Sequence, residues 1–281
     1  MSMISDSSAV LELQRILPQH QSAITLLNNM VQDPCINEIK WLDLACGKGQ
    51  IISQLKENLS DNNRKKIIYD GYDINVEFTK IASRIASNLE LRQYRFNHGD
   101  LSNFAVVLGV EKEFDFITCT NVAHELHPNA FVSLVLDSFK RLTSSGQLFI
   151  YDMESLTTPE LGAFPLRGNE ITSLLNTIFE CLNTVYRVHA SVWSHKTCKG
   201  WSIIINRAHI SIENEIFDKE KKAITNKIKL KIDDIIQSRC KECVDLLTTY
   251  TIYGADTAED EQLKLVALYE FWALHYARGG K

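Results

Sequence analysis

The chain reads Lys40-Trp41-Leu42-Asp43-Leu44-Ala45-Cys46-Gly47-Lys48-Gly49-Gln50, a short apolar run that passes into a glycine-rich turn and then into sequence typical of a helix. A strand that ends in such a turn leaves backbone N–H groups pointing at one spot. Gly47 and Gly49 have no Cβ, so a ligand can approach their backbone closely. Asp43 adds a carboxylate, which suits a ligand that bears an ammonium group. We therefore predict a ligand site at this turn.

A second acidic residue follows the next strand along the chain. We predict that strand over residues 66–73, and Asp73 is its last residue. A carboxylate in this place can accept both hydroxyls of a ribose, which indicates a nucleoside site. The turn does not match the dinucleotide pattern G-x-G-x-x-G, because Ile52 stands where the third glycine belongs. A nicotinamide-dependent dehydrogenase is therefore disfavoured.

Five short segments carry a resemblance to a known family. Residues 43–49, 71–73, 99–101, 114–117 and 146–150 resemble, in their order and near their spacing, the motifs of class I S-adenosylmethionine-dependent methyltransferases, which have a Rossmann-like fold. The resemblance covers residues 39 to about 153 and leaves the subfamily unassigned. It implies S-adenosyl-L-methionine as cofactor and methyl transfer as the activity.

The resemblance also implies which residues bind the cofactor: Asp43, Ala45, Cys46, Gly47, Gly49, Asp73, Ile74, Asp100, Leu101 and Asn121. An acid at Asp100 would take the exocyclic amine of adenine, Leu101 would pack on the ring, and Asn121 would contact the methionine end. The alternative for Asp100 is a plain helix N-cap. The family's usual first turn glycine is Ala45 here, and we expect an alanine to fit only with a negative φ.

Candidate catalytic residues follow the fourth predicted strand. His124, Glu125 and His127 place two imidazoles and a carboxylate within four residues, which can supply a general base. We predict catalytic roles for His124 and Glu125 and a substrate contact for His127. The alternative for Glu125 and His127 is that they only begin a helix. Metal binding is disfavoured, because H-E-x-H differs from the zinc-helix pattern H-E-x-x-H.

A long irregular segment, residues 152–168, follows the fifth predicted strand. Long loops in this position are often functional. We predict that Phe164 and Arg167 contact the substrate. The alternative is a solvent loop that Phe164 pins.

Strands and helices alternate from residue 39 onward, which predicts an α/β fold with a doubly wound, mostly parallel seven-stranded sheet. We expect strands at 39–44, 67–72, 94–98, 114–120 and 147–151. A terminal antiparallel hairpin near 184–193 and 201–207 would complete the sheet. The predicted divisions are an N-terminal helical lid or cover (1–36), the methyltransferase-like domain (37–210) and a C-terminal helical hairpin (211–281).

The C-terminal part carries an apolar stripe that recurs every three or four residues, from Ile224 to Leu247. It should dock on the sheet domain or form a homodimer contact. Residues 263–276 are apolar on most sides, so we expect them to be largely buried. Cys240 and Cys243 could join His195 and Cys198 in a zinc site, but buried cysteines on the stripe are the simpler interpretation. No metal is predicted.

Composition sets further bounds. The chain has 281 residues, 45% of them hydrophobic, and a formal net charge of −5, which argues against a generally basic nucleic-acid binder. Seven cysteines suit a reducing compartment, and no basic leader or long apolar run stands out. We expect a cytoplasmic protein without membrane contact.

The predicted function is methyl transfer to an unidentified acceptor, most simply a small molecule. Two alternatives stay open. Gly47-Lys48-Gly49 is similar to the turn of messenger-RNA cap guanine-N7 methyltransferases, so RNA is one alternative acceptor. The other is a protein that binds the cofactor or a partner without catalysis.

Overall fold

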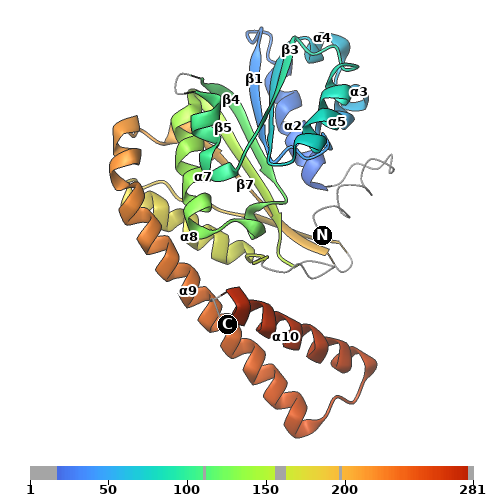
Figure 1. Cartoon of the computed structure of the whole chain (residues 1–281), viewed down its shortest axis with the longest axis vertical. Helices are drawn as coiled ribbons and strands as arrows, with labels where there is room; N and C mark the ends of the chain where they lie inside the picture. The colour runs from blue at the N-terminus through green and yellow to red at the C-terminus, as the bar shows by residue number, and fades with distance from the viewer. Residues whose placement is uncertain (1–17, 110–111, 156–162, 196–197, 278–281) are drawn as a thin grey trace.

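The computed structural model describes residues 18–109, 112–155, 163–195 and 198–277. The described residues form a seven-stranded sheet in the order β3-β2-β1-β4-β5-β7-β6 (Figure 1). The strands β1 to β5 run parallel, whereas β7 is antiparallel to β5 and β6 is antiparallel to β7. The predicted fold is confirmed. The bounds are β1 Ile39–Leu44, β2 Ile67–Asp73, β3 Gln93–His98, β4 Phe114–Thr120, β5 Leu142–Met153, β6 Ser191–His195 and β7 Cys198–Asn206.

The terminal hairpin begins later in the chain than the sequence pattern predicts. Residues 184–190 are not a strand, because side chains of the preceding helix bind their backbone N–H groups. Asn176 accepts the N–H of Val188 at 2.8 Å, and Thr172 accepts the N–H of Ala190 at 3.2 Å. The sheet ladder therefore starts only at Ser191.

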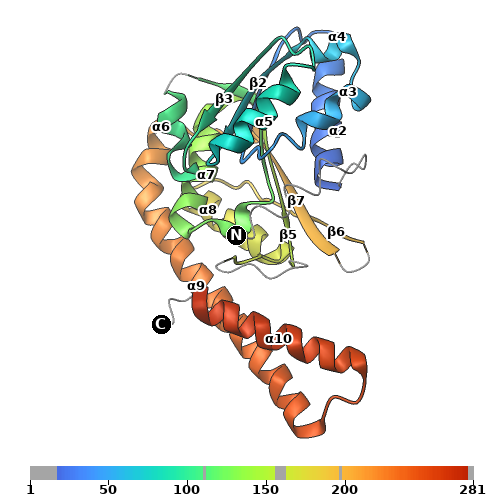
Figure 2. The ribbon, with the colours of Figure 1, turned by 45° about the vertical axis from the view of Figure 1, so that its right-hand side comes forward.

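Helices cover both faces of the sheet (Figure 2). Along β4 and β5 the core side chains alternate, with Phe116 and Phe149 in one cluster and Ile117 and Ile150 in the other. The first cluster includes side chains of α2 Pro18–Gln32, α3 Leu55–Asn58 and α5 Val76–Ala86, and α4 Asp61–Arg64 lies beside α2. The second packs against α6 Phe104–Leu108, α7 Pro128–Arg141 and α8 Gly168–Cys181.

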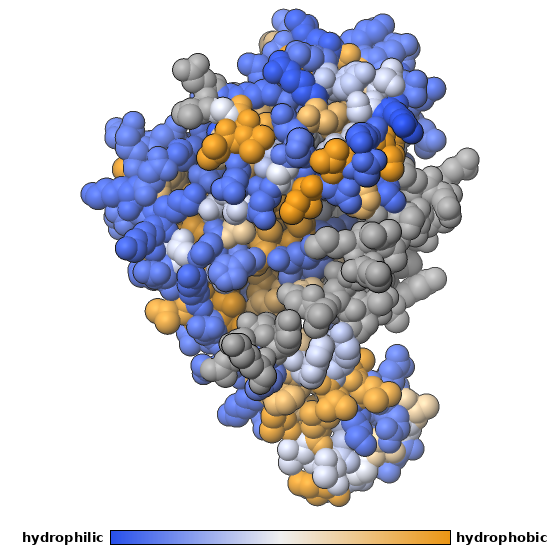
Figure 3. All heavy atoms as spheres, in the orientation of Figure 1, coloured by the Kyte–Doolittle hydropathy of each residue, from blue (hydrophilic) through white to orange (hydrophobic). Residues whose placement is uncertain are grey.

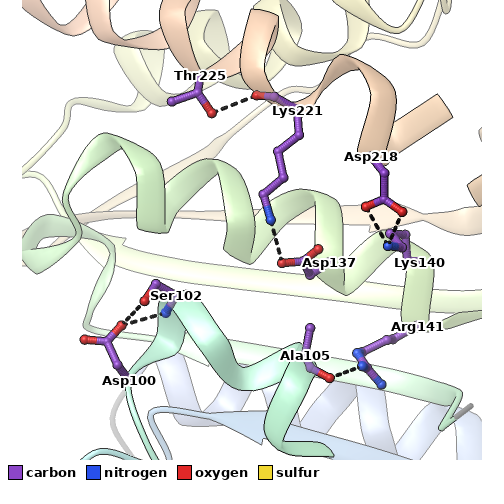
Figure 4. A network of polar contacts seen from close by, with 9 residues as sticks. All are labelled: Asp100, Ser102, Ala105, Asp137, Lys140, Arg141, Asp218, Lys221 and Thr225. Atoms are coloured by element: carbon purple, nitrogen blue, oxygen red, sulfur yellow. Dashed lines mark hydrogen bonds and ion pairs between the residues drawn. The ribbon is translucent and has the colours of Figure 1, made fainter. Parts of the chain in front are cut away.

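A long helix, α9 Asn214–Tyr253, lies outside α7 and α8. Its first half belongs to the core of the sheet domain, because Phe217, Ile224 and Ile228 are fully buried there. Two ion pairs hold it to α7: Lys221 Nζ lies 3.0 Å from Asp137, and Lys140 Nζ lies 2.8 Å from Asp218 (Figure 4).

The second half of α9 extends beyond the sheet domain and pairs with α10 Ala258–Ala277 as a projecting hairpin (Figure 1). The expectation that residues 263–276 are largely buried is wrong. Leu265 is 63% exposed and Trp272 is 50% exposed, and apolar side chains reach the surface of the projecting part (Figure 3). The main neighbour of α10 among the described residues is α9, which covers one side of it.

Candidate functional site

The candidate site lies at the edge of the sheet where the strands β1 to β5 end. The strand order reverses between β1 and β4, and open α/β sheets bind ligands outside the carboxyl ends of the strands at such a point. The predicted cofactor residues follow β1, β2, β3 and β4 in turn. The topology therefore brings them to one edge, as the sequence predicts.

The turn after β1 has a backbone that suits glycine. Gly47 and Gly49 have φ angles of +55° and +86°. A Cβ on Gly49 would lie 3.1 Å from Cα of Ala82 in α5, so this glycine also permits close packing of the turn on the helix. Lys48 lies between them, with Nζ 5.1 Å from the centroid of the Phe78 ring.

Asp73 joins the ends of β1 and β2. Its Oδ2 accepts the N–H of Gly47 at 2.8 Å, and its Oδ1 accepts the N–H of Asn75 at 2.8 Å. Burial raises the pKa of this carboxyl, and the hydrogen bonds from backbone N–H groups oppose the rise. The next side chain, Ile74, is 65% exposed. A fixed carboxylate and an open apolar surface thus stand side by side at the strand end.

Ala45 does not have the negative φ that we expected from its side chain. Its φ is +56°, and Asn121 at the end of the neighbouring strand β4 has a φ of +55°. A left-handed conformation costs a non-glycine residue about 1–2 kcal/mol. The following N–H of Cys46 donates to Tyr72 O, and the N–H of Asn121 donates to Tyr151 O, so the sheet holds both segments in place. Strain of this kind gathers at ligand sites.

Asp43 lies beneath the turn and is 1% exposed. Its two carboxylate oxygens accept hydrogen bonds from Tyr69 Oη at 2.9 Å and Thr118 Oγ1 at 2.6 Å. Burial raises the pKa of Asp43 to about 7, although these two hydrogen bonds act to lower it. Cys46 is also buried, which raises the pKa of its thiol. Both residues support the turn from within the core.

Asp100 follows β3 and caps the short 3-10 helix Leu101–Asn103. Its Oδ1 accepts hydrogen bonds from Ser102 Oγ at 2.6 Å and Ser102 N–H at 2.7 Å (Figure 4). These bonds lower the pKa of Asp100, so its carboxylate is ionised at neutral pH. The helix-cap role that we considered for Asp100 is thus observed, and Leu101 beside it is half-buried.

His124 lies in the short 3-10 helix Ala123–Glu125 after β4 and is 7% exposed. Its Nδ1 is 2.7 Å from Oδ1 of Asp152, and its backbone N–H donates to Oδ2 of the same residue at 2.8 Å. The Nε2 atom lies 3.7 Å from Oε1 of Glu125. Asp152 is 1% exposed and stands near the end of β5.

Asp152 was missing from the predicted site. The signal was present in the sequence, because Asp152 ends the apolar part of the fifth strand as Asp73 ends the second. The strand-end rule that selected Asp73 therefore also selects Asp152.

The three predicted substrate residues lie in different surroundings. His127 is exposed and caps α7 by accepting the N–H of Asn129 at 3.4 Å. Phe164 donates its N–H to the carbonyl of His124 at 2.7 Å, so it adjoins the candidate base. Arg167 is the N-cap residue of α8, and its guanidinium lies 2.9 Å from Glu242 of α9. Phe164 is the one of these three that the structure brings beside His124.

Neither a metal cluster nor a membrane-crossing helix is found in the described ranges. No three His, Cys, Asp or Glu side chains there gather in an arrangement that could hold a metal ion. Cys243 is buried on α9, while the side chains of His195 and Cys198 lie outside those described. No helix within 18–109, 112–155, 163–195 or 198–277 combines the length and apolar content that crossing a bilayer requires.

Comparison with known families gives one match by sequence. A methyltransferase-domain family matches residues 37–197, more than half of the chain. No curated protein matches the chain.

Several solved structures share the fold. The magnesium protoporphyrin IX methyltransferase of Synechocystis PCC 6803, solved with bound SAH, is 13% identical with a TM-score of 0.51, over 73% of this chain and 95% of that one. The DszA carbon methyltransferase is 19% identical with a TM-score of 0.51, over 68% of this chain and 53% of that one. At these identities the likeness concerns the fold.

Proposed function

We propose that this chain, which belongs to the S-adenosylmethionine-dependent methyltransferases, methylates a small molecule with His124 as the general base. The observation that supports this most is the buried His124–Asp152 pair, which lies at the same sheet edge as the Gly47 turn. The same sheet edge thus carries the turn that we assign to the nucleoside and a positioned imidazole.

The residues at the turn fit the cofactor. S-adenosylmethionine supplies an electrophilic methyl group, and its sulfur keeps the electron pair of the broken bond. We assign the ribose to Asp73, which a cluster of backbone N–H groups holds at the strand end. Exposed Ile74 offers an apolar surface for the base, and the glycine turn leaves backbone room for the methionine end.

The His124–Asp152 pair prepares one nitrogen for proton transfer. Because Oδ1 of Asp152 accepts from Nδ1–H of His124, the Nε2 atom carries the lone pair. His124 Nε2 can then take the proton that the acceptor loses when it gains the methyl group. A positioned base of this kind contributes roughly 10²–10⁴-fold to a rate. Asp152 holds the tautomer and the ring orientation.

Two observations favour a small molecule over RNA. The chain has a net charge of −5. Six lysines lie between residues 219 and 231 of α9, and one of them, Lys221, pairs with Asp137, which neutralises its charge. The fold neighbours include a magnesium protoporphyrin IX methyltransferase and carbon methyltransferases. The cytoplasmic location and a homodimer through the C-terminal helices stay predictions.

The test uses S-adenosylmethionine with a labelled methyl group, the purified chain, and either a small-molecule extract or total RNA. Our proposal predicts label in one or a few small molecules and its loss with His124→Ala. His189→Ala is the matched control, because His189 is an exposed histidine in the segment between α8 and β6 and is not among the candidate site residues. Label that enters RNA, or transfer that His124→Ala leaves unchanged, would contradict the proposal.

A further inference from the structure

We propose that the C-terminal hairpin completes the acceptor site, and that a cavity beneath α10 holds an uncharged, largely apolar acceptor. This inference rests on the proposed function, because it takes His124 as the place of reaction. It assigns a role to α9 and α10, which lie outside the segment that the family match covers.

The cavity lies between the hairpin and two described pieces of chain that follow β5, residues 154–155 and 163–165. Its volume is about 360 Å³, which is within the usual size of small-molecule sites. The segment after β5 contributes Ala163, Phe164 and Pro165, and α10 contributes a stripe that recurs every three or four residues: Gln262, Leu265, Val266, Tyr269, Glu270, Ala273 and Leu274. A helix that presents one continuous face to a cavity has this spacing.

The cavity explains part of the exposed apolar surface of α10. Leu265, Val266 and Tyr269 are 63%, 54% and 38% exposed, and all three line the cavity. Burying such side chains against an apolar ligand removes apolar surface from water, which favours binding. Leu268 of the same helix is 54% exposed but does not line the cavity.

Phe164 connects the cavity to the candidate base. Its side chain lines the cavity, and its backbone N–H donates to the carbonyl of His124 at 2.7 Å. An acceptor whose apolar body lies in the cavity therefore contacts Phe164, which is hydrogen-bonded directly to His124. Its reacting group would point past Phe164 toward the strand ends.

Arg239 of α9 holds Phe164 and Pro165 in place at the cavity. Its side chain is 5% exposed, and its guanidinium lies 5.1 Å from the centroid of the Phe164 ring. The guanidinium donates to the carbonyl of Pro165 at 2.8 Å and to both carboxylate oxygens of Glu170 at the start of α8. Arg239 is thus a positioning residue that ties the hairpin to the segment after β5.

The charges around the cavity select the class of acceptor. Arg239 is the cation that lines it among the described residues, and Glu170 and Glu270 already pair with it. Glu154 accepts the N–H of Gly168 at 2.7 Å. Two lining carboxylates against one paired cation disfavour a phosphate or a carboxylate ligand. We therefore infer an uncharged body and recognition through apolar contact.

The test uses N-phenyl-1-naphthylamine, an uncharged aromatic probe that fluoresces in apolar sites. We expect saturable binding to the full-length chain and at least a tenfold loss of affinity with Ala273→Trp, which fills the cavity. Leu268→Trp adds bulk to the same helix outside the cavity and should bind like the unaltered chain. A second matched pair introduces a charge: Val266→Asp lies in the cavity lining and should lose probe binding, whereas Leu263→Asp lies outside it and should not. Both side chains are exposed, so neither substitution should disturb folding.

Equal binding by both members of each pair, or no saturable binding at all, would overturn the cavity assignment. Titration with S-adenosylmethionine separates the two proposals, because Ala273→Trp should leave cofactor affinity unchanged. If the probe results hold while His124→Ala leaves methyl transfer intact, the cavity stands and the catalytic proposal fails.

Discussion

The Nδ1 atom of His124 lies 2.7 Å from the carboxylate of Asp152, which also accepts the backbone N–H of His124 at 2.8 Å. Two bonds from one buried carboxylate fix both the ring and the backbone of the candidate base. Removing the base should lower kcat by about 10²–10⁴-fold in His124→Ala without changing cofactor affinity. Asp152→Asn should lower kcat as well, because an amide can stabilise the other tautomer. Steady-state kinetics check this, and unchanged kcat in both variants would remove His124 from the mechanism.

The left-handed backbone of Ala45 predicts a stabilising substitution. Ala45→Gly removes a steric cost of about 1–2 kcal/mol and adds an unfolded-state cost of roughly 0.5–1 kcal/mol, so the net gain should be up to about 1.5 kcal/mol. Ala82→Gly is the control, because Ala82 lies inside α5 at an ordinary helical position. It should destabilise the chain by about 1 kcal/mol or more. Urea unfolding measures the free energy of unfolding of both variants. An equal loss of stability in Ala45→Gly and Ala82→Gly would contradict backbone strain at Ala45.

Burial of Asp43 predicts a pH dependence of stability. Its pKa rises from 3.8 to about 7 on folding, so the folded chain binds the proton more tightly than the unfolded chain does. The stabilisation is complete below pH 4 and disappears as the pH rises through 7. It amounts to roughly 4 kcal/mol at most. The free energy of unfolding, relative to Asp43→Asn, should therefore fall between pH 4 and 7. A difference in unfolding free energy that does not change between pH 4 and 7 would contradict a raised pKa for Asp43.

The Arg239–Glu170 pair is buried, with side chains 5% and 11% exposed. Removing one partner leaves an uncompensated charge, so Arg239→Met should destabilise the chain by about 3–5 kcal/mol. Adding Glu170→Gln should recover most of this loss, because the remaining carboxylate charge is removed. Thermal unfolding of the single and double variants tests the coupling.

The exposed pair Lys80–Glu77 provides the control for that experiment, since its side chains are 59% and 74% exposed. Lys80→Met should change stability little, because surface ion pairs contribute little. A double variant as unstable as Arg239→Met alone would show that the pair does not act as a unit.

The fold could be predicted because its signals are local and repeat along the chain. Apolar runs that end at Leu44, Asp73 and Thr120 mark buried strands, and the topological switch places their ends together. Most of the candidate cofactor residues follow from this rule. Phe164 also lies beside His124, but the sequence does not show which residue Phe164 contacts.

The tertiary pairs could not be predicted, because periodicity shows that a face is apolar without naming its partner. His124 and Asp152 are 28 residues apart, and Arg239 and Glu170 are 69 residues apart. For the same reason the apolar sides of α10 indicated burial, whereas the structure leaves Trp272 half exposed. At Ala45, hydrogen bonds of the sheet impose a φ angle that local sterics disfavour.

The most direct measurement is calorimetric titration of the purified chain with S-adenosylmethionine and its demethylated product, repeated on Asp73→Ala and Glu77→Gln. Our account predicts micromolar binding of both ligands, its loss in Asp73→Ala and its retention in Glu77→Gln, because Glu77 is an exposed acid on α5. No binding to the unaltered chain, or equal binding by Asp73→Ala, would contradict the assignment of the cofactor to this turn.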